Sequence, residues 1–331
     1  MPAQNQYKDQ PQTTRQRLWP KRLVWSLLLL LLLLNVLSFL HAYKLTHFAD
    51  NQTPKTSLST DLFWAEKLKL LITGTGKPRP ENSRKPNTYF EVVELKGNEK
   101  MVCWHLKDTA SQLQRKGVVV LCHGYGGEKS GMLNKAEILD SLGFDTFLID
   151  FRGSGGSEGN TTSLGYYEAE QVKRAYDYLA QTGEPNIYLF GTSMGAVAVM
   201  KALNDYALKP KAIVLECPYG SLYEAVSLRL SNMQAPVFPF AILLTFWGGL
   251  QQGFWAFDLS PRLYAKQITS PILLLFGEQD TKVSKRETQD IFQNLNSKKQ
   301  LKVYPKAGHE SYLIKYKNEW THDVNNFLSG L

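Results

Sequence analysis

Cysteine is scarce in this chain, with three among 331 residues. So few cysteines cannot form the dense disulfide framework of a small secreted module. The excess of positive over negative charge is also small, with 38 basic residues against 30 acidic ones. Half of the formal net charge of +8 lies in residues 1–22. The rest of the chain has no Lys/Arg cluster interleaved with aromatic residues, so we expect no nucleic-acid partner.

The sequence also excludes fibrous and disordered proteins. The sequence has no Gly-x-y repeat and no sustained heptad pattern. Its hydrophobic content of 43% and aromatic content of 12% are too high for a wholly disordered chain. At this length the chain can bury a large core, and we expect a globular protein.

A long apolar segment follows the basic N-terminal tail. Leu23–Leu40 carries no charge and includes an unbroken leucine run over residues 27–34. Eighteen helical residues span about 27 Å, close to the thickness of a bilayer core. We therefore expect a transmembrane anchor at 23–40, preceded by a basic cytoplasmic tail at 1–22. The positive-inside rule then places the remainder on the outer side of a single-pass membrane protein.

A cleaved signal peptide is the main alternative to an anchor. Its apolar region usually has only about 7 to 15 residues and ends at a site of small residues. Here the sequence after Leu40 offers a small residue only at Ala42. Residues 41–87 lack a clear pattern except for a short amphipathic stretch, Asp61–Leu71. We interpret 41–87 as a tether that carries a short amphipathic helix.

Strands and helices are expected to alternate from residue 88 to the C-terminus. The first two strands form a hairpin around Gly97, and each later apolar strand is followed by a helix, except where one long insertion intervenes. This alternation predicts an α/β domain at 88–331 with a mostly parallel sheet covered by helices on both faces. The expected strands are 89–95, 100–107, 118–122, 146–150, 187–190, 212–215, 272–276 and 301–304, with helices at 135–142, 167–180, 194–204, 286–295 and the C-terminus.

The insertion is uncharged and rich in aromatic residues. Between Arg229 and Asp258 there is no acidic or basic residue. Pro236 and Pro239 interrupt the segment, which argues against a second membrane span. We expect an apolar cap at about 219–265.

The strand at 187–190 leads into a candidate nucleophile. Residues 191–195 read Gly-Thr-Ser-Met-Gly and are followed at once by an apolar helix. A Gly-x-Ser-x-Gly turn between a strand and a helix exposes the serine hydroxyl above the sheet. Ser193 is therefore the expected nucleophile.

A serine hydroxyl needs a general base, and the base needs a carboxylate to orient it. His309 follows the strand at 301–304, which places it at the carboxyl end of the sheet, where open α/β folds bind ligands. Asp280 follows the strand at 272–276, and we prefer it over the competing carboxylates Glu278 and Asp258. The chain order is then Ser193, Asp280, His309.

Backbone donors must also stabilise the oxyanion that forms during attack. A glycine-rich loop with the sequence His-Gly-Tyr-Gly-Gly occupies residues 123–127 after the strand at 118–122. We expect the backbone amides of Tyr125 and Met194 to form the oxyanion hole. His123 is expected to support the loop.

Together these motifs resemble the α/β-hydrolase superfamily, over residues from about 86 to 331. The sequence Asp-Phe-Arg-Gly-Ser-Gly at 150–155 resembles the loop that supports the oxyanion strand. The chain is similar to the branch of membrane-anchored serine hydrolases and serine aminopeptidases. That resemblance implies an eight-stranded sheet of order 1-2-4-3-5-6-7-8 with a cap after the sixth strand. In this order Cys122 and Cys217 lie on strands that are separated by one intervening strand, which is too far for a disulfide bond. Free buried thiols are therefore expected.

The expected function is hydrolysis of carboxylic esters through an acyl-enzyme on Ser193. An apolar cap beside a membrane anchor favours a hydrophobic acyl substrate reached at the lipid surface. The chemistry requires no metal and no organic cofactor, and the glycines at 153–156 lack the third glycine of a dinucleotide fingerprint. The same residues could serve a peptidase, an amidase or a thioesterase. A non-catalytic binding protein on a hydrolase fold is the alternative from another class.

Overall fold

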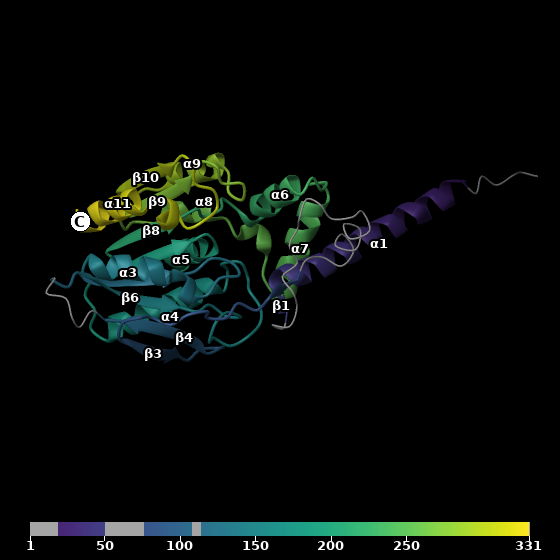
Figure 1. The fold of residues 1–331 in the computed structure, drawn as a ribbon. Helices are drawn as coiled ribbons and strands as arrows, with labels where there is room; N and C mark the ends of the chain where they lie inside the picture. Colours follow the sequence, from purple (N-terminus) through teal and green to yellow (C-terminus); the bar gives the residue numbers. More distant parts are fainter. Residues whose placement is uncertain (1–18, 50–75, 108–113, 331) are drawn as a thin grey trace, which may run out of the picture.

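The structure is a computed structural model that describes residues 19–49, 76–107 and 114–330. An eight-stranded sheet with flanking helices forms its body, and one long helix, α1 (Trp19–Thr46), projects from it (Figure 1). By length and composition, Lys21–Thr46 of this helix can cross a membrane.

The sheet has the strand order β3-β4-β6-β5-β7-β8-β9-β10. Within the sheet this is the expected order 1-2-4-3-5-6-7-8. β4 runs antiparallel to both of its neighbours, and the other pairs are parallel. The strands are β3 (Phe90–Leu95), β4 (Met101–Leu106), β5 (Gly117–Cys122), β6 (Phe144–Ile149), β7 (Ile187–Thr192), β8 (Ala212–Glu216), β9 (Ile272–Gly277) and β10 (Lys299–Tyr304).

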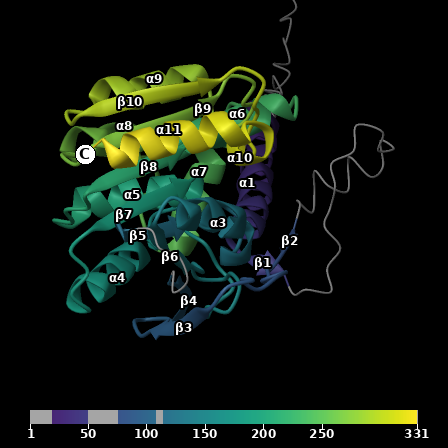
Figure 2. The same cartoon turned by 60° about the vertical axis from the view of Figure 1, so that its left-hand side comes forward.

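Helices cover both faces of the sheet (Figure 2). One face packs against α4 (Glu168–Gln181), α5 (Met194–Asp205) and α9 (Lys285–Asn294), and the other against α3 (Leu133–Ser141) and α11 (Lys317–Ser329). Consecutive residues of β5 alternate between these two cores, since side chains of a strand point to opposite faces. This burial on both sides explains why the central strands read as continuous apolar runs.

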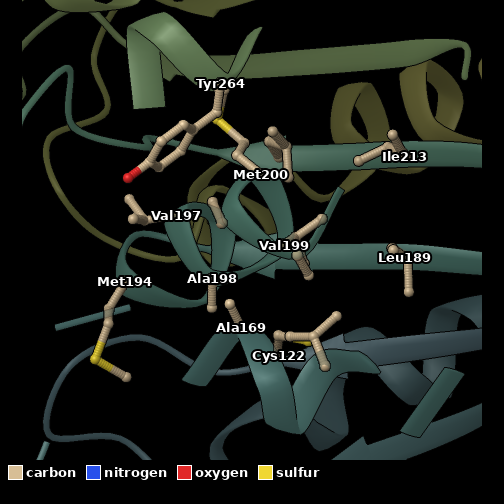
Figure 3. Packing of buried hydrophobic residues seen from close by; sticks show 14 of the residues in the cluster. Cys122, Ala169, Leu189, Met194, Val197, Ala198, Val199, Met200, Ile213 and Tyr264 are labelled. Carbon is tan, nitrogen blue, oxygen red and sulfur yellow. The ribbon is translucent and has the colours of Figure 1, made fainter. Parts of the chain in front are cut away.

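The packing around α5 shows how the sequence produces these layers. Ala196–Ala202 is almost wholly buried, since α5 lies between β5 and β7 on one side and α4 and α8 (Pro261–Tyr264) on the other. Figure 3 shows Val197 and Met200 of this helix close to Tyr264, and Ala198 facing Ala169. The small side chains of Ala198 and Ala169 allow α5 and α4 to approach each other closely.

The cap lies between β8 and β9, the sixth and seventh strands of the sheet. It contains α6 (Leu222–Asn232) and α7 (Phe240–Gln252), followed by the short α8 and two single turns of 3₁₀ helix. Pro239 precedes the first residue of α7, and Gly253 ends it with φ 74°. The uncharged insertion is therefore a pair of helices whose prolines lie in the turn between them.

α1 continues without a break past Leu40, the expected end of the anchor, to Thr46. Residues 41–46 are helical because they pack on the cap, with Ala42 and Thr46 buried. The chain then forms β1 (Phe48–Ala49), which pairs in parallel with β2 (Lys77–Pro78). The described parts of the expected tether therefore dock on the domain. The expected amphipathic helix at Asp61–Leu71 lies outside the described residues.

All three cysteines are buried and free. β7 lies between β5, which ends with Cys122, and β8, which precedes Cys217. The expectation of free buried thiols is thereby confirmed.

Candidate active site

Ser193 lies in a tight turn between β7 and α5. Its backbone has φ 52° and ψ −116°, a conformation that L-residues rarely adopt. A Cβ atom at Gly191 would lie 2.5 Å from Cα of Ala196, and one at Gly195 would lie 2.3 Å from the carbonyl oxygen of Cys122. Only glycine fits at these two positions, and together they allow the turn that projects Ser193 from the sheet.

His309 lies in the loop after β10 and joins Ser193 to Asp280. Its Nε2 is 3.0 Å from Ser193 Oγ, and its Nδ1 is 2.7 Å from Asp280 Oδ2. An ionised carboxylate can only accept, so Nδ1 carries the proton and Nε2 accepts from the serine hydroxyl. Three residues separated by up to 116 positions thus form one chain of hydrogen bonds with a basic nitrogen directed at the hydroxyl.

Asp280 is fixed by its own turn. Its side chain is fully buried, and Oδ1 accepts hydrogen bonds from the backbone amides of Lys282 (2.7 Å) and Val283 (3.0 Å). Of the competing carboxylates, Glu278 pairs with exposed Lys285 at 3.0 Å, and Asp258 is exposed in the cap. Asp280 is therefore the carboxylate that reaches His309.

The glycine-rich loop after β5 passes beside the turn that carries Ser193. A Cβ atom at Gly124 would lie 3.5 Å from Cβ of Ser193. Met194 is the first residue of α5, where backbone amides have no partner within the helix. Within the described ranges, the amides of Tyr125 and Met194 donate to no backbone acceptor. Both remain available to an oxygen bound next to Ser193.

His123 holds this loop in place. Its Nε2 accepts from the amide of Phe151 at 3.1 Å, so Nδ1 carries the proton and donates to the carbonyl oxygen of Gly124 at 2.8 Å. Burial lowers the pKa of His123, which keeps the ring in the neutral form that this pattern requires. The expected supporting role agrees with these contacts.

A buried ion pair lies directly beneath Ser193, and sequence reasoning missed it. The amide of Ser193 donates to the carbonyl oxygen of Glu216 at 2.8 Å. The carboxylate of Glu216 contacts Lys135 Nζ (2.7 Å), Thr192 Oγ1 (3.0 Å) and Trp320 Nε1 (2.8 Å), and it is fully buried. An acidic residue at the end of a strand was the only available signal, and its partners come from three distant segments.

A second buried pair supports the loop at 150–155. Asp150 Oδ1 accepts from the amide of Lys129 at 2.7 Å, and Oδ2 contacts Lys129 Nζ. Oδ2 also accepts from the amide of Gly156 and from Asn82 Nδ2, each at 2.8 Å. A Cβ atom at Gly155 would overlap the Asp150 carboxylate, so a glycine is required at this position for close packing around the charge.

Cys217 is the remaining buried group next to His309 and Asp280. The sulfur and the ligand atoms of these two residues lie within 4.8 Å of one another, a spacing that a small metal ion could bridge. Burial raises the pKa of the Cys217 thiol, so the thiolate that metal binding needs is disfavoured. Both other ligands already take part in the Ser193 hydrogen-bond chain. The set fits a metal poorly.

An apolar cavity of about 20 Å³ lies between α1, α6 and α7 and is lined by Ala42, Val226, Leu244 and Leu164 among others. Thr162, two residues before Leu164, contacts Met194 Sδ at 3.3 Å. A larger hollow of about 620 Å³ lies between β10 and α11 and includes none of Ser193, Asp280 and His309.

Several known proteins are similar to this chain in sequence. An uncharacterised protein of Bacillus subtilis, YqkD, is 24% identical over 217 residues, which cover 64% of this chain and 71% of that protein. An uncharacterised protein of Mycobacterium tuberculosis, Rv2307c, is 26% identical over 74% of this chain and 81% of its own length. The lysophosphatidylserine lipase ABHD12 of Mus musculus is 27% identical over 49% of this chain but only 41% of its own length.

Solved structures share the fold. The esterase Pf2001 of Pyrococcus furiosus superposes with a TM-score of 0.64 at 23% identity and covers 76% of this chain and 96% of its own. An esterase of Exiguobacterium antarcticum gives a TM-score of 0.54 at 16% identity, over 73% of this chain and all of its own.

The sequence also matches a family model, described as serine aminopeptidase, S33, over residues 114–244 and 262–313. That match covers more than half of the chain and includes Ser193, Asp280 and His309. The chain therefore belongs to this family and, with it, to the α/β-hydrolase superfamily.

Proposed function

We propose that this protein is a membrane-anchored serine hydrolase that cleaves carboxylic esters of hydrophobic acyl groups. The observation that carries the proposal is the hydrogen-bond chain from Ser193 Oγ through His309 to Asp280. Its donor and acceptor roles leave Nε2 ready to take the serine proton. Neither metal nor organic cofactor is needed for this chemistry.

In the proposed reaction, Ser193 Oγ attacks the ester carbonyl as His309 Nε2 takes its proton. Asp280 stabilises the resulting imidazolium, and the amides of Tyr125 and Met194 stabilise the oxyanion. His309 then gives the proton to the oxygen of the leaving group. The alcohol departs, and the acyl group remains bonded to Ser193 Oγ. Water, activated by His309, attacks this acyl-enzyme and releases the acid.

The acyl preference is proposed from the cap. Its helices and α1 enclose an apolar cavity that now has room for about one water molecule, so an acyl chain would enter by separating α1 from α6. Ser163 and Leu164 line this cavity, and the preceding residue, Thr162, contacts the side chain of Met194, which follows Ser193 in the chain. The lipase relative and the esterase structures support an ester substrate over a peptide.

The membrane anchor belongs to the same proposal. The helical segment Lys21–Thr46 is long and apolar, and its N-terminal end carries the basic residues Lys21 and Arg22. We place the N-terminus in the cytoplasm and the hydrolase domain on the outer side, because basic residues favour the cytoplasmic side. Membrane lipid is then close to the cap.

The test compares nitrophenyl esters of short, medium and long acyl chains, with the full chain in detergent micelles. We expect turnover that increases with chain length and disappears in Ser193→Ala. A fluorophosphonate probe should label the parent protein and not the variant. Faster cleavage of amino-acid amides than of any ester would favour a peptidase, and an absence of both labelling and turnover would favour a binding protein.

A further inference from the structure

The cap helix α7 lies along the part of α1 that is expected inside the membrane. Trp247 Nε1 donates to Asn35 Oδ1 at 3.2 Å, and Gln251 Nε2 donates to the carbonyl oxygen of Phe39 at 2.8 Å. The rings of Phe39 and Trp247 meet edge to face with centroids 5.3 Å apart. Figure 1 shows α7 beside the C-terminal part of α1, while the rest of α1 projects freely.

The freely projecting part of α1 is too short to cross a bilayer. Side chains from Leu23 to Leu33 are exposed, and burial against the domain begins at Leu34. At 1.5 Å per residue, Leu23–Leu33 is only about 16 Å long, whereas a bilayer core is about 30 Å thick. Counted from Leu23, such a core extends to about Ala42.

The segment of α1 that contacts α7 must therefore lie within the membrane if α1 spans it. Asn35 is then about 10 Å below the outer edge of the hydrocarbon core. A polar side chain at that depth requires a partner, and Asn35 has two, since its Nδ2 donates to the carbonyl oxygen of Leu31 at 2.9 Å. The partner of its Oδ1 comes from the cap.

The surface of the cap around α7 suits this environment. Residues 230–257 contain no charge. Large apolar side chains here are exposed to an extent that is unusual for a surface in water: Phe238 is 78% exposed, Leu250 56% and Trp255 55%. Aromatic residues are typical of the interface between lipid and water, and Trp255 lies in a group with Phe246 and Phe257.

We propose that the cap helix α7, with Phe238 and Trp255 at its two ends, is embedded in the outer leaflet of the bilayer that α1 spans. The inference rests on the proposed membrane anchor. α1 and α7 then form one hydrophobic unit, and the cap cavity between α1, α6 and α7 is adjacent to the acyl chains of the membrane. A hydrophobic substrate could pass from the leaflet to the cavity without entering water.

The proposal can be tested by spin labelling of the full chain in phosphatidylcholine vesicles. All three native cysteines are buried, so a nitroxide reagent is directed to a single introduced cysteine. The test sites are Phe238→Cys and Leu250→Cys in the cap. Leu29→Cys is the control for the anchor, and Ile314→Cys, which is 76% exposed in α10 (Tyr312–Lys315), is the control for water. Each of these side chains is exposed, so the changes should not disturb the fold.

We expect collisions with oxygen to exceed those with a water-soluble nickel chelate several-fold at Leu29, Phe238 and Leu250, and the reverse at Ile314. Lipid access at Leu29 with water access at Phe238 and Leu250 would overturn the embedding of α7 and leave the anchor intact. Water access at Leu29 would overturn the anchor and this inference together. Hydrolysis of soluble short esters by each variant gives an independent check on the proposed activity.

Discussion

The hydroxyl of Tyr125 donates a 2.9 Å hydrogen bond to the carbonyl oxygen of Leu45 in the last turn of α1. The amide of the same tyrosine is a proposed oxyanion donor, so the end of α1 contacts the loop beside Ser193. Lys77 Nζ lies 4.1 Å from the centroid of the tyrosine ring, and Phe48 stacks on it. The chain on both sides of the segment 50–75 therefore packs against this loop.

Tyr125→Phe should weaken this connection and keep the backbone amide. Loss of one hydrogen bond with a partly buried partner costs about 0.5 to 1.5 kcal/mol. We expect kcat for ester hydrolysis to fall several-fold with little change in KM, because the loop that holds the amide becomes less fixed. Tyr89→Phe, at an exposed tyrosine, is the control. An unchanged kcat would show that the contact with α1 has no effect on the reaction.

Asp280→Asn should abolish most activity and preserve the fold. The Asn Oδ1 still accepts from the amides of Lys282 and Val283, but its NH₂ group would face His309 Nδ1. The imidazole would then carry its proton on Nε2, which could not accept from Ser193. A loss of about ten-thousand-fold in kcat is expected from the wrong tautomer. Retention of more than about a tenth of the activity would remove Asp280 from the proposed mechanism.

Lys135→Met should destabilise the protein by leaving the buried Glu216 carboxylate without its cation. Removing one partner of a buried ion pair costs about 3 to 5 kcal/mol. In the double variant Lys135→Met/Glu216→Gln, most of this loss should be recovered. The control, Lys285→Met, breaks the exposed pair with Glu278 and should cost at most about 1 kcal/mol. Denaturant unfolding in micelles measures all three, and equal effects of the two lysine changes would contradict the argument.

Acid should destabilise the fold through His123, whose pKa is lowered by burial from its ordinary value of 6.5. Below pH 6.5 the unfolded chain binds a proton at this ring while the folded chain does not, so stability decreases as pH falls from 6.5 towards the lowered pKa. The melting temperature, measured from about pH 8 down to about pH 5, should therefore fall towards the acid end of this range.

The matched variant for this effect is His123→Gln, which has no titrating ring. Its melting temperature should depend less steeply on pH below 6.5, although the pKa of His105 is also lowered by burial and leaves part of the slope. Parallel pH profiles for the parent and the variant would exclude His123 as the source.

Val226→Trp should reduce the cap cavity and change selectivity. Val226 lines the cavity from α6, where a larger ring would occupy the space proposed for an acyl chain. We expect kcat/KM for long-chain esters to fall at least about tenfold, with little change for short esters, because a blocked pocket affects only the groups that enter it. Tyr223→Trp on the exposed side of α6 is the control. Equal losses for all chain lengths would contradict the proposed acyl site.

The order of the motifs could be predicted from the sequence because each depends on local chemistry. Flanking glycines identify the turn at Ser193. A run of apolar residues identifies the strand before Asp280, and alternating apolar residues identify the strand before His309. Parallel strands bring these ends to one edge of the sheet, so three residues distant in sequence were expected to meet. The uncharged insertion predicted the cap, whereas the sheet order and the position of the cap after the sixth strand followed from the resemblance to the α/β-hydrolase superfamily.

The tertiary structure decided how α1 packs against the rest of the molecule. The sequence by itself determined that residues 23–40 are apolar and helical, since leucine favours a helix and no charge interrupts the run. It did not show that α1 continues to Thr46, or that Asn35 pairs with Trp247. Both depend on packing between α1 and the cap, and Asn35 and Trp247 are 212 residues apart in the sequence. In the same way, the partners of Glu216 and Asp150 depend on which helices cover the sheet. Local patterns determine the elements, but the neighbours of a buried polar group are fixed only when the elements pack.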